Sequence, residues 1–295
     1  MKIKLIVNPK SGTEIVRKIK NSEDLLRKSG ADLHAFITLK RGDAEVWAKN
    51  AIEESFERII VAGGDGTINE VINGIVNPEK DMIQPPIGII PVGVSNVLAL
   101  EIGIPLNMEE STAIAIKGKI KPVSLGISNG RYFSLMAGAG FDAEVVCRLN
   151  LKLKRYLGKW AYIVAGIKLI FNYKPPLLEI ITDSGEVLKG YSAIVGKSKY
   201  YGGKFTVTPE AGIEKEELDL CLFQKGKRRD ILRYVFGVLT KIHLGFKDVV
   251  YRKVKGLKIT SQGRVPVQID GDCFGELPVN ISLKPEAVRL VFPKE

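Results

Sequence analysis

The sequence contains few of the residues on which several common kinds of site depend. Its 295 residues include two histidines, His34 and His243, which lie far apart and do not predict a histidine-based triad or a zinc site. No apolar stretch approaches the roughly 18 residues of a membrane-spanning helix. The first residues lack the long apolar region and cleavage site of a signal peptide. We therefore expect a cytoplasmic protein that does not cross a bilayer.

Cysteine is also scarce. Cys147, Cys221 and Cys273 are odd in number, widely spaced and without a C-x-x-C pair. This pattern predicts that all three are small core residues of a protein in a reducing compartment.

Two familiar nucleotide-binding motifs are missing. Gly196-Lys197-Ser198 resembles the end of a P-loop, but Tyr191 occupies the position of the required first glycine. Gly64-x-Gly66 is followed by Asn69 where a Rossmann fingerprint needs glycine or alanine. A phosphate site in this chain must therefore be built in another way.

The composition is that of an ordinary globular protein with one large or two ordinary domains, since 45% of residues are apolar and 26% are charged. The net charge of +11 is unevenly distributed: residues 1–122 carry 16 Lys+Arg against 16 Asp+Glu, and residues 123–295 carry 28 against 17. A basic surface suits nucleic acid or anionic lipid, and charge alone does not separate these two partners from a generic basic surface.

Strands and helices alternate in the first part of the chain. Helical patterns cover residues 13–28 and 43–55, and the expected strands are 2–7, 35–39, 59–62 and 85–91. Repeated alternation of this kind predicts a mainly parallel sheet covered by helices.

The stretch 59–74 organises this part of the chain. An apolar strand stops at Gly63-Gly64-Asp65-Gly66-Thr67 and a helical pattern follows at once. Such a junction presents bare backbone N–H groups at the positive end of a helix, where a phosphate can approach. Thr67 and Glu70 have the spacing of a capping box, which predicts that the helix begins at Thr67.

The second part changes to short strands separated by turns. Asn129-Gly130 and Asp183-Ser184-Gly185 are hairpin signals, so we expect an antiparallel β domain. Residues 153–171 show helical spacing, and residues 148–174 contain seven Lys+Arg and no acid. This predicts a basic amphipathic helix for an anionic membrane surface, with a helix packed on the β domain as the alternative. A second basic run, 225–233, is either a solvated turn or part of the same face.

Carboxylates lie close to glycines at two points. Asp65 is in the first glycine turn, and Asp270-Gly271-Asp272 follows an expected strand at 265–269. Phosphoryl transfer needs a cradle for the polyphosphate, a divalent ion, and a carboxylate that orients or deprotonates the attacking hydroxyl. The alternative for the second group is a plain hairpin turn, because Asp-Gly is a common turn dipeptide.

Taken together, these motifs resemble the diacylglycerol kinase catalytic-domain family of lipid kinases, which includes bacterial diacylglycerol kinases and sphingosine kinases. The resemblance rests on Asn8-Pro9-x-Ser11-Gly12, Gly63-Gly64-Asp65-Gly66-Thr67-x-Asn69-Glu70-Val71-x-Asn73-Gly74, Pro91-x-Gly93-x-x-Asn96, Gly140-Phe141-Asp142-Ala143 and Asp270-Gly271-Asp272. It covers nearly the whole chain in the right order.

The resemblance implies an α/β fold with an N-terminal parallel-sheet nucleotide domain, similar to NAD kinases and phosphofructokinases, and a C-terminal antiparallel β-sandwich for the lipid, with ATP in the cleft between them. It assigns nucleotide binding to Asn8, Ser11, Gly12, Thr38, Gly63, Gly64, Asp65, Gly66, Thr67, Asn69, Gly93 and Ser95. Asp65 would also act through Mg²⁺, and Asn69 would brace the loop. Asp272 would be the catalytic base that accepts the lipid hydroxyl's proton.

The sequence departs from the family pattern at two points. Val94 replaces a threonine near the nucleotide, and Ser95 is the nearest hydroxyl. Some bacterial members bind a structural Mg²⁺ in a loop that aligns with residues 212–217. Lys215 stands where the binding aspartate would be, which argues against a structural metal here.

We therefore predict an ATP-binding domain over 1–122 and a lipid-substrate domain over 123–295. The cofactors would be ATP and Mg²⁺, and the product a phosphorylated membrane lipid such as one made from diacylglycerol. The protein would be peripherally bound to an anionic membrane, with no nucleic-acid partner because the basic segments lack interleaved stacking residues. The alternatives are an NAD kinase-like small-molecule kinase and a lipid-binding or regulatory member without catalysis.

Overall fold

The computed structural model describes residues 1–294 except 10–12, 77–83, 149–165, 167–168 and 171–172. The chain forms two compact units. Unit 1 comprises Met1–Ser124 and Pro285–Glu295, and unit 2 comprises Leu125–Lys284. The sequence assigned the whole of 123–295 to the second domain, so the structure moves the last eleven residues to the first unit.

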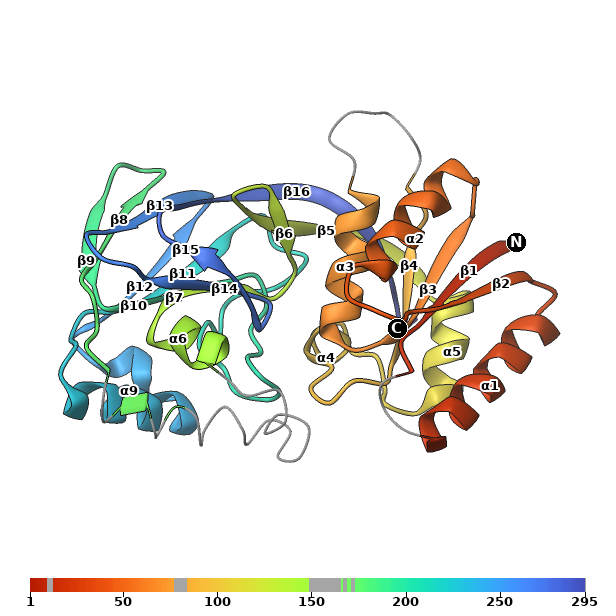
Figure 1. Cartoon of the computed structure of the whole chain (residues 1–295), viewed down its shortest axis with the longest axis horizontal. Coiled ribbons are helices and arrows are strands. Elements are labelled where there is room, and N and C mark those ends of the chain that lie inside the picture. Colours follow the sequence, from red (N-terminus) through yellow and green to blue (C-terminus); the bar gives the residue numbers. More distant parts are fainter. Residues whose placement is uncertain (10–12, 77–83, 149–165, 167–168, 171–172, 295) are drawn as a thin grey trace. The chain divides into compact units, whose positions relative to one another are not determined.

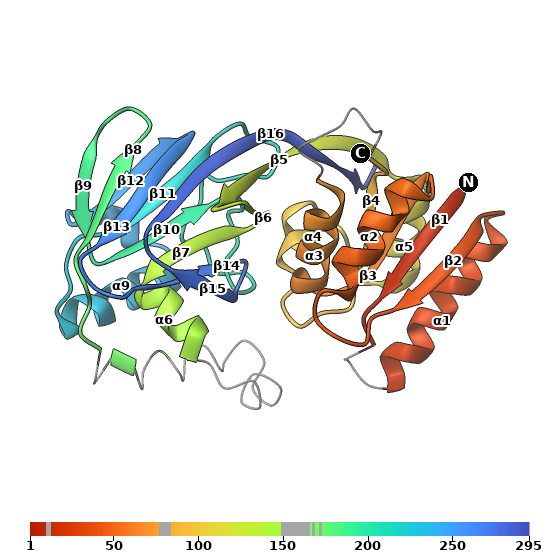
Figure 2. The same cartoon turned by 45° about the horizontal axis from the view of Figure 1, so that its top comes forward.

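Unit 1 contains a parallel sheet, as predicted. Its strands are β1 (Lys2–Val7), β2 (Asp32–Ile37), β3 (Arg58–Gly63) and β4 (Ile87–Pro91), in the order β2-β1-β3-β4. Helices α1 (Thr13–Lys28) and α5 (Met108–Lys117) lie together on one face, and α2 (Asp43–Glu53) and α3 (Asp65–Ile75) pack together on the other (Figures 1 and 2). The short helix α4 (Val97–Glu101) follows β4.

The core of unit 1 follows from the period of two along a strand. Ile3, Leu5 and Val7 alternate along β1 and belong to one buried cluster with Leu26 of α1 and Ala115 of α5. The strands β3 and β4 are buried at every position, because helices cover both faces of the sheet. This packing fixes the carboxyl ends of the strands along one edge.

Unit 2 is built from antiparallel strands. These are β6 (Arg131–Phe133), β7 (Met136–Gly140), β8 (Leu178–Thr182), β9 (Val187–Gly190), β10 (Ser192–Gly196), β11 (Leu218–Phe223), β12 (Val249–Val254), β13 (Gly256–Ser261), β14 (Pro266–Ile269) and β15 (Asp272–Glu276). One sheet has the order β12-β11-β10-β7-β14-β15 (Figure 2). In the other, β13 pairs with β8, which pairs with β9. One buried cluster draws Ala139 and Val195 from the first sheet and Ile180 and Ile259 from the second, so the predicted β-sandwich is confirmed.

Two long strands belong to both parts of the chain. β5 (Lys119–Ser128) leads out of unit 1 and forms a hairpin with β6 around Asn129 and Gly130, both at positive φ as the predicted turn requires. β16 (Val279–Phe292) pairs antiparallel with β13 through Ile281 and then parallel with β4 through Leu290. Leu290 therefore joins the sheet of unit 1, which explains the corrected boundary.

Within its described residues, unit 2 also contains α6 (Phe141–Arg148), α9 (Arg228–Thr240) and the 3₁₀ turn His243–Gly245. The predicted basic helix 153–171 lies outside the described residues apart from positions 166, 169 and 170. Leu169 and Ile170 are buried in a cluster with Val145 of α6 and Ile231 of α9. Among the helices that the structure describes, none has the length and apolar composition to cross a membrane.

Candidate active site

The carboxyl edge of the unit 1 sheet brings several predicted nucleotide-binding residues together. Asn8 follows β1, Thr38 follows β2, and Gly63 ends β3. The backbone N–H of Asn8 donates to Ala62 O at 2.9 Å, and that of Thr38 donates to Val7 O at 2.8 Å. Ligands of open parallel sheets bind at this edge. Ser11 and Gly12 fall outside the described residues, so their assignment stays a prediction.

The helix after the glycine turn begins earlier than the sequence predicted. α3 starts at Asp65 with Gly64 as its N-cap, so the capping box of Thr67 and Glu70 is wrong. The Thr67 hydroxyl instead accepts a hydrogen bond of 2.8 Å from Asn8 Nδ2, which ties β1 to the first turn of α3. Because glycine has no side chain, no N-cap side chain covers the first N–H groups of α3, and an anion can approach them.

The glycine turn is packed backbone against backbone. A Cβ at Gly93 would lie 2.5 Å from Gly64 Cα, and a Cβ at Gly64 would lie 3.1 Å from Gly93 Cα. Asn96 closes the second turn, because its Oδ1 accepts from Gly93 N and its Nδ2 donates to Gly93 O, each at 2.8 Å. The structure therefore unites Gly63, Gly64 and Gly93 in one place, and Asn96 is the residue that holds this arrangement.

The side chains beside the two glycine turns differ in their exposure and in their hydrogen-bond partners. Val94, which replaces the family threonine, is 76% exposed, and Ser95 beside it is half-buried. Asp65 is half-buried, and its Oδ1 accepts a hydrogen bond of 3.0 Å from Leu98 N in α4. Asn69 is buried, and its Oδ1 and backbone oxygen accept bonds from Asn73 Nδ2. Its expected role as a brace of the loop stays a prediction.

Thr38 provides an independent sign of a ligand at this edge. Its side chain is buried, and its Oγ1 has no hydrogen-bond partner within the part of the chain that the structure describes. A buried hydroxyl without a partner is costly, and a ligand oxygen or a bound water would satisfy it. Thr38, the Asp65 carboxylate and the N–H groups of α3 all lie at the carboxyl edge of the sheet, and they are the kinds of group that bind a nucleotide phosphate with Mg²⁺.

The carboxylate corner of unit 2 is a two-residue hairpin turn between β14 and β15. Asp270 and Gly271 both have positive φ, 49° and 81°, as such a turn requires, and the catalytic role of this corner stays a prediction. The Asp270 carboxylate accepts hydrogen bonds from the backbone N–H groups of Ser134, Leu135 and Met136 at 2.9–3.0 Å. Asp270 therefore anchors the corner. Asp272 follows two residues later as the first residue of β15, and its side chain is half-buried.

A buried polar chain connects α6 to this corner. Asp142 in the first turn of α6 accepts a hydrogen bond of 2.9 Å from Gln268 Nε2, and Gln268 Oε1 accepts one of 2.8 Å from Gly271 N. Burial raises the pKa of Asp142 to about 7, although the Gln268 hydrogen bond opposes this shift. A Cβ at Gly138 would lie 2.1 Å from Asp142 Oδ2, so glycine is needed there.

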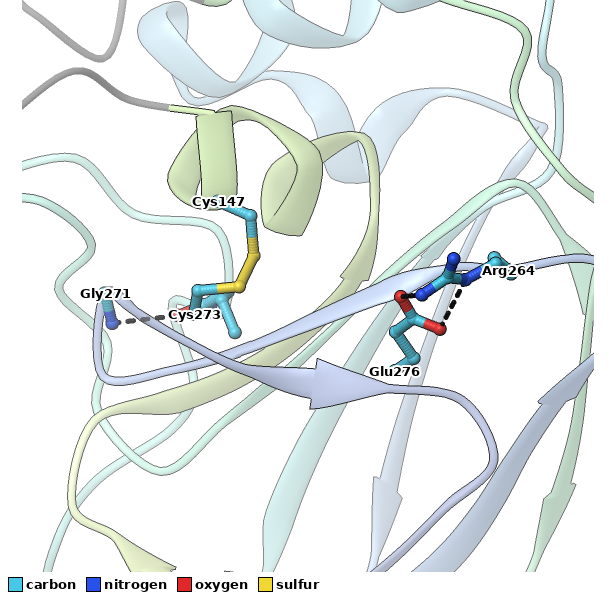
Figure 3. The surroundings of a disulfide bond; sticks show 6 residues. Cys147, Arg264, Gly271, Cys273 and Glu276 are labelled. Carbon is cyan, nitrogen blue, oxygen red and sulfur yellow. Dashed lines mark hydrogen bonds and ion pairs between the residues drawn. A yellow bond between two sulfur atoms is a disulfide. The ribbon is translucent and has the colours of Figure 1, made fainter.

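The sequence prediction was wrong for two of the three cysteines. Cys147 of α6 and Cys273 of β15 form a disulfide, although 126 positions separate them (Figure 3). Cys221 is the buried core residue that was predicted. Cys273 directly follows Asp272, so the disulfide belongs to the same corner. Sequence reasoning missed it because spacing cannot show which distant cysteines the fold brings together.

The loop at 212–217, which aligns with the structural metal site of some family members, surrounds the ammonium group of Lys197. Lys197 is completely buried, and its Nζ donates hydrogen bonds to the backbone oxygens of Gly212, Lys215 and Glu217. These oxygens are the kind of ligand that a hard metal ion would take. The described residues hold no group of three or more His, Cys, Asp or Glu suited to a metal. The residues of this loop therefore do not fit a structural Mg²⁺.

Comparison with known proteins gives a consistent picture over the whole length. Residues 2–127 match the diacylglycerol kinase catalytic domain, and residues 136–292 match the YegS C-terminal NAD kinase beta sandwich-like domain. The diacylglycerol kinase of Bacillus subtilis is 31% identical over 99% of this chain and 96% of its own, and that of Staphylococcus carnosus is 30% identical over 99% and 95%.

A solved structure agrees with the sequence relatives. The crystal structure of a diacylglycerol kinase from Bacillus anthracis shares 27% identity with a TM-score of 0.79, covering 99% of this chain and 96% of that one. Fold, motifs and full-length relatives thus agree, and the chain belongs to the diacylglycerol kinase catalytic-domain family, a family of kinases.

Proposed function

We propose that this protein is an ATP-dependent lipid kinase that transfers the γ-phosphate to a hydroxyl of a membrane lipid such as diacylglycerol. The observation that carries the proposal is the carboxylate corner of unit 2. Asp270 holds the turn through the backbone N–H groups of Ser134, Leu135 and Met136, and Asp272 lies half-buried at the start of β15, two residues later. Asp272 is then the base that orients the lipid hydroxyl and accepts its proton.

Unit 1 supplies the nucleotide half of the reaction in this proposal. The N–H groups at the start of α3 and the Thr38 hydroxyl bind phosphate oxygens, and the close packing of Gly64 on Gly93 keeps side chains out of the turn. Asp65 holds the Mg²⁺ that accompanies ATP, which neutralises charge on the phosphates when it is bound.

The decisive experiment is incubation with labelled ATP, Mg²⁺ and vesicles of a total lipid extract, followed by identification of the labelled lipid. Asp272→Asn should lower lipid phosphorylation by roughly 10²–10⁴-fold while ATP binding persists. Asp183→Asn, in another hairpin turn of unit 2, is the matched control. Full activity of Asp272→Asn would remove this residue from the mechanism.

The same experiment separates the alternatives. A non-catalytic lipid-binding member would label no lipid, and an NAD kinase-like enzyme would label NAD added in place of lipid. The full-length relatives named diacylglycerol kinase favour the lipid.

We further propose that unit 2 binds an anionic membrane surface through α9, which makes the protein a peripheral membrane protein of the cytoplasm. Leu232, Phe236 and Leu239 are 52%, 59% and 43% exposed and recur at helical spacing on one stripe of α9. Residues 225–247 carry seven Lys+Arg, all exposed, against one acid. An exposed apolar stripe with a basic surround is the pattern of an interfacial helix.

Vesicle sedimentation tests this surface without depending on activity. Phe236→Ser should reduce binding to vesicles that contain phosphatidylglycerol roughly tenfold, and raised salt should weaken binding of the wild type. Val46→Ser is the matched control, because Val46 is a helical residue of unit 1 with 57% exposure. Binding that is indifferent to Phe236→Ser, salt and anionic lipid would contradict the membrane surface.

A further inference from the structure

Two separate connections join α6 to the corner that carries Asp272. At the start of the helix, Asp142 reaches Gly271 N through the side chain of Gln268. Near its end, Cys147 is bonded to Cys273 (Figure 3). Gly271 precedes Asp272 and Cys273 follows it, so the backbone on both sides of this carboxylate is attached to the same helix.

The strand that begins with Asp272 lies at the edge of its sheet. There β15 pairs with β14 in a register broken by an irregularity at Val267 and Gln268. Residues Cys273–Glu276 are exposed. At the far end of the strand, Glu276 forms an ion pair with Arg264, which precedes β14 and is 88% exposed (Figure 3). An exposed ion pair contributes little to stability, whereas the disulfide joins β15 to α6 covalently.

We propose that Cys147 and Cys273 are positioning residues whose disulfide fixes Asp272 on α6, so that its reduction loosens the corner and lowers phosphoryl transfer. This inference rests on the proposed role of Asp272. A small displacement of a catalytic group from its productive geometry can cost a large factor in rate, which is why a link beside the base matters.

A dithiol reduces the Cys147–Cys273 disulfide by thiol–disulfide exchange. A thiolate of a dithiol reductant attacks one sulfur and forms a mixed disulfide, and its second thiol then closes a ring and releases the remaining cysteine. Two electrons and two protons pass to Cys147 and Cys273, and the reductant becomes a cyclic disulfide. Cys273 is exposed and Cys147 is half-buried, so a small dithiol can reach the bond.

The test compares lipid phosphorylation by the full chain before and after treatment with dithiothreitol, with the thiol state verified by mass spectrometry. Reduction should lower kcat roughly tenfold and leave the KM for ATP unchanged. Cys147→Ser and Cys273→Ser should each show the lower kcat without further response to dithiothreitol. Cys221→Ala, which removes the thiol outside the disulfide, should behave like the wild type. Because a smaller folded fraction would also lower the apparent kcat without changing the KM, the assay is run well below the unfolding temperature of the reduced protein.

Amide hydrogen exchange of the segment 268–276 provides a readout that does not depend on the activity. Faster exchange after reduction supports the tether, whereas unchanged exchange together with unchanged kcat overturns it. If the oxidised wild type phosphorylates no lipid, the proposed function fails, and the exchange measurement alone decides whether the disulfide orders the corner.

Discussion

The two glycine-containing corners of this protein are built in different ways. In unit 1, Gly64 and Gly93 meet backbone to backbone, which is possible because neither residue has a side chain. In unit 2, the corner at 270–272 is held by side chains: the Asp270 carboxylate, the Gln268 amide and the Cys273 sulfur. A turn that receives phosphate needs exposed N–H groups, whereas a turn that presents a carboxylate needs that group held in place. Added side-chain volume should therefore disrupt the corner of unit 1, and removal of a hydrogen-bond acceptor should disrupt the corner of unit 2.

The largest effect is expected from removing an acceptor in unit 2. Asp270→Ala would leave the N–H groups of Ser134, Leu135 and Met136 without their carboxylate, so the free energy of unfolding should fall by about 3 kcal/mol or more. Urea unfolding measures this loss. Asp272→Asn should change stability little, and equal losses for both variants would mean that Asp270 is not the anchor.

Added volume in unit 1 should give a smaller and more local effect. The Cβ of Gly93→Ala would lie 2.5 Å from Gly64 Cα, so the two turns must move apart. We expect the KM for ATP to rise roughly tenfold, with a stability loss of about 1–3 kcal/mol. Gly263→Ala is the control, since a Cβ there meets nothing within 4 Å. An unchanged KM would show that the close approach is not needed for the nucleotide.

The smallest effect is expected from the titration of Asp142, which connects α6 to the corner of unit 2. The pKa of Asp142 is raised by burial from 3.8 to about 7, so the folded chain binds more protons than the unfolded chain between these values. The contribution of Asp142 to the free energy of unfolding therefore falls as pH rises through this window. The stability of Asp142→Asn relative to the wild type should therefore rise by roughly 2–3 kcal/mol between pH 5 and pH 8. A difference that does not depend on pH would show that Asp142 does not titrate in this range.

Local patterns in the sequence predicted local structure well. The apolar run before Gly63, the alternation of strands and helices in unit 1, and the Asn129-Gly130 turn all appear as expected, because each depends on neighbours along the chain. The capping box was wrong because Asn8, from a distant strand, takes the Thr67 hydroxyl. A tertiary contact there overrides a local preference.

The site itself was predicted in part. Resemblance named Asn8, Gly64 and Gly93, and the structure gathers them at one edge of the sheet. The resemblance could not name Gln268 or the Cys147–Cys273 disulfide. Both contacts form between residues that are more than a hundred positions apart in the sequence and meet only in the fold. Asp142 was part of a motif, yet only the fold shows the burial that raises its pKa to about 7.

The strand β16 has a consequence for how the protein is made. Because its end pairs with β4, the sheet of unit 1 is complete only when β16 has been synthesised. Unit 2 is a continuous segment inserted within unit 1, and it can fold on the ribosome while the first unit still waits for its final strand. A gene fragment that stops after residue 124 would therefore encode a sheet with an unpaired edge at β4, prone to association with other chains.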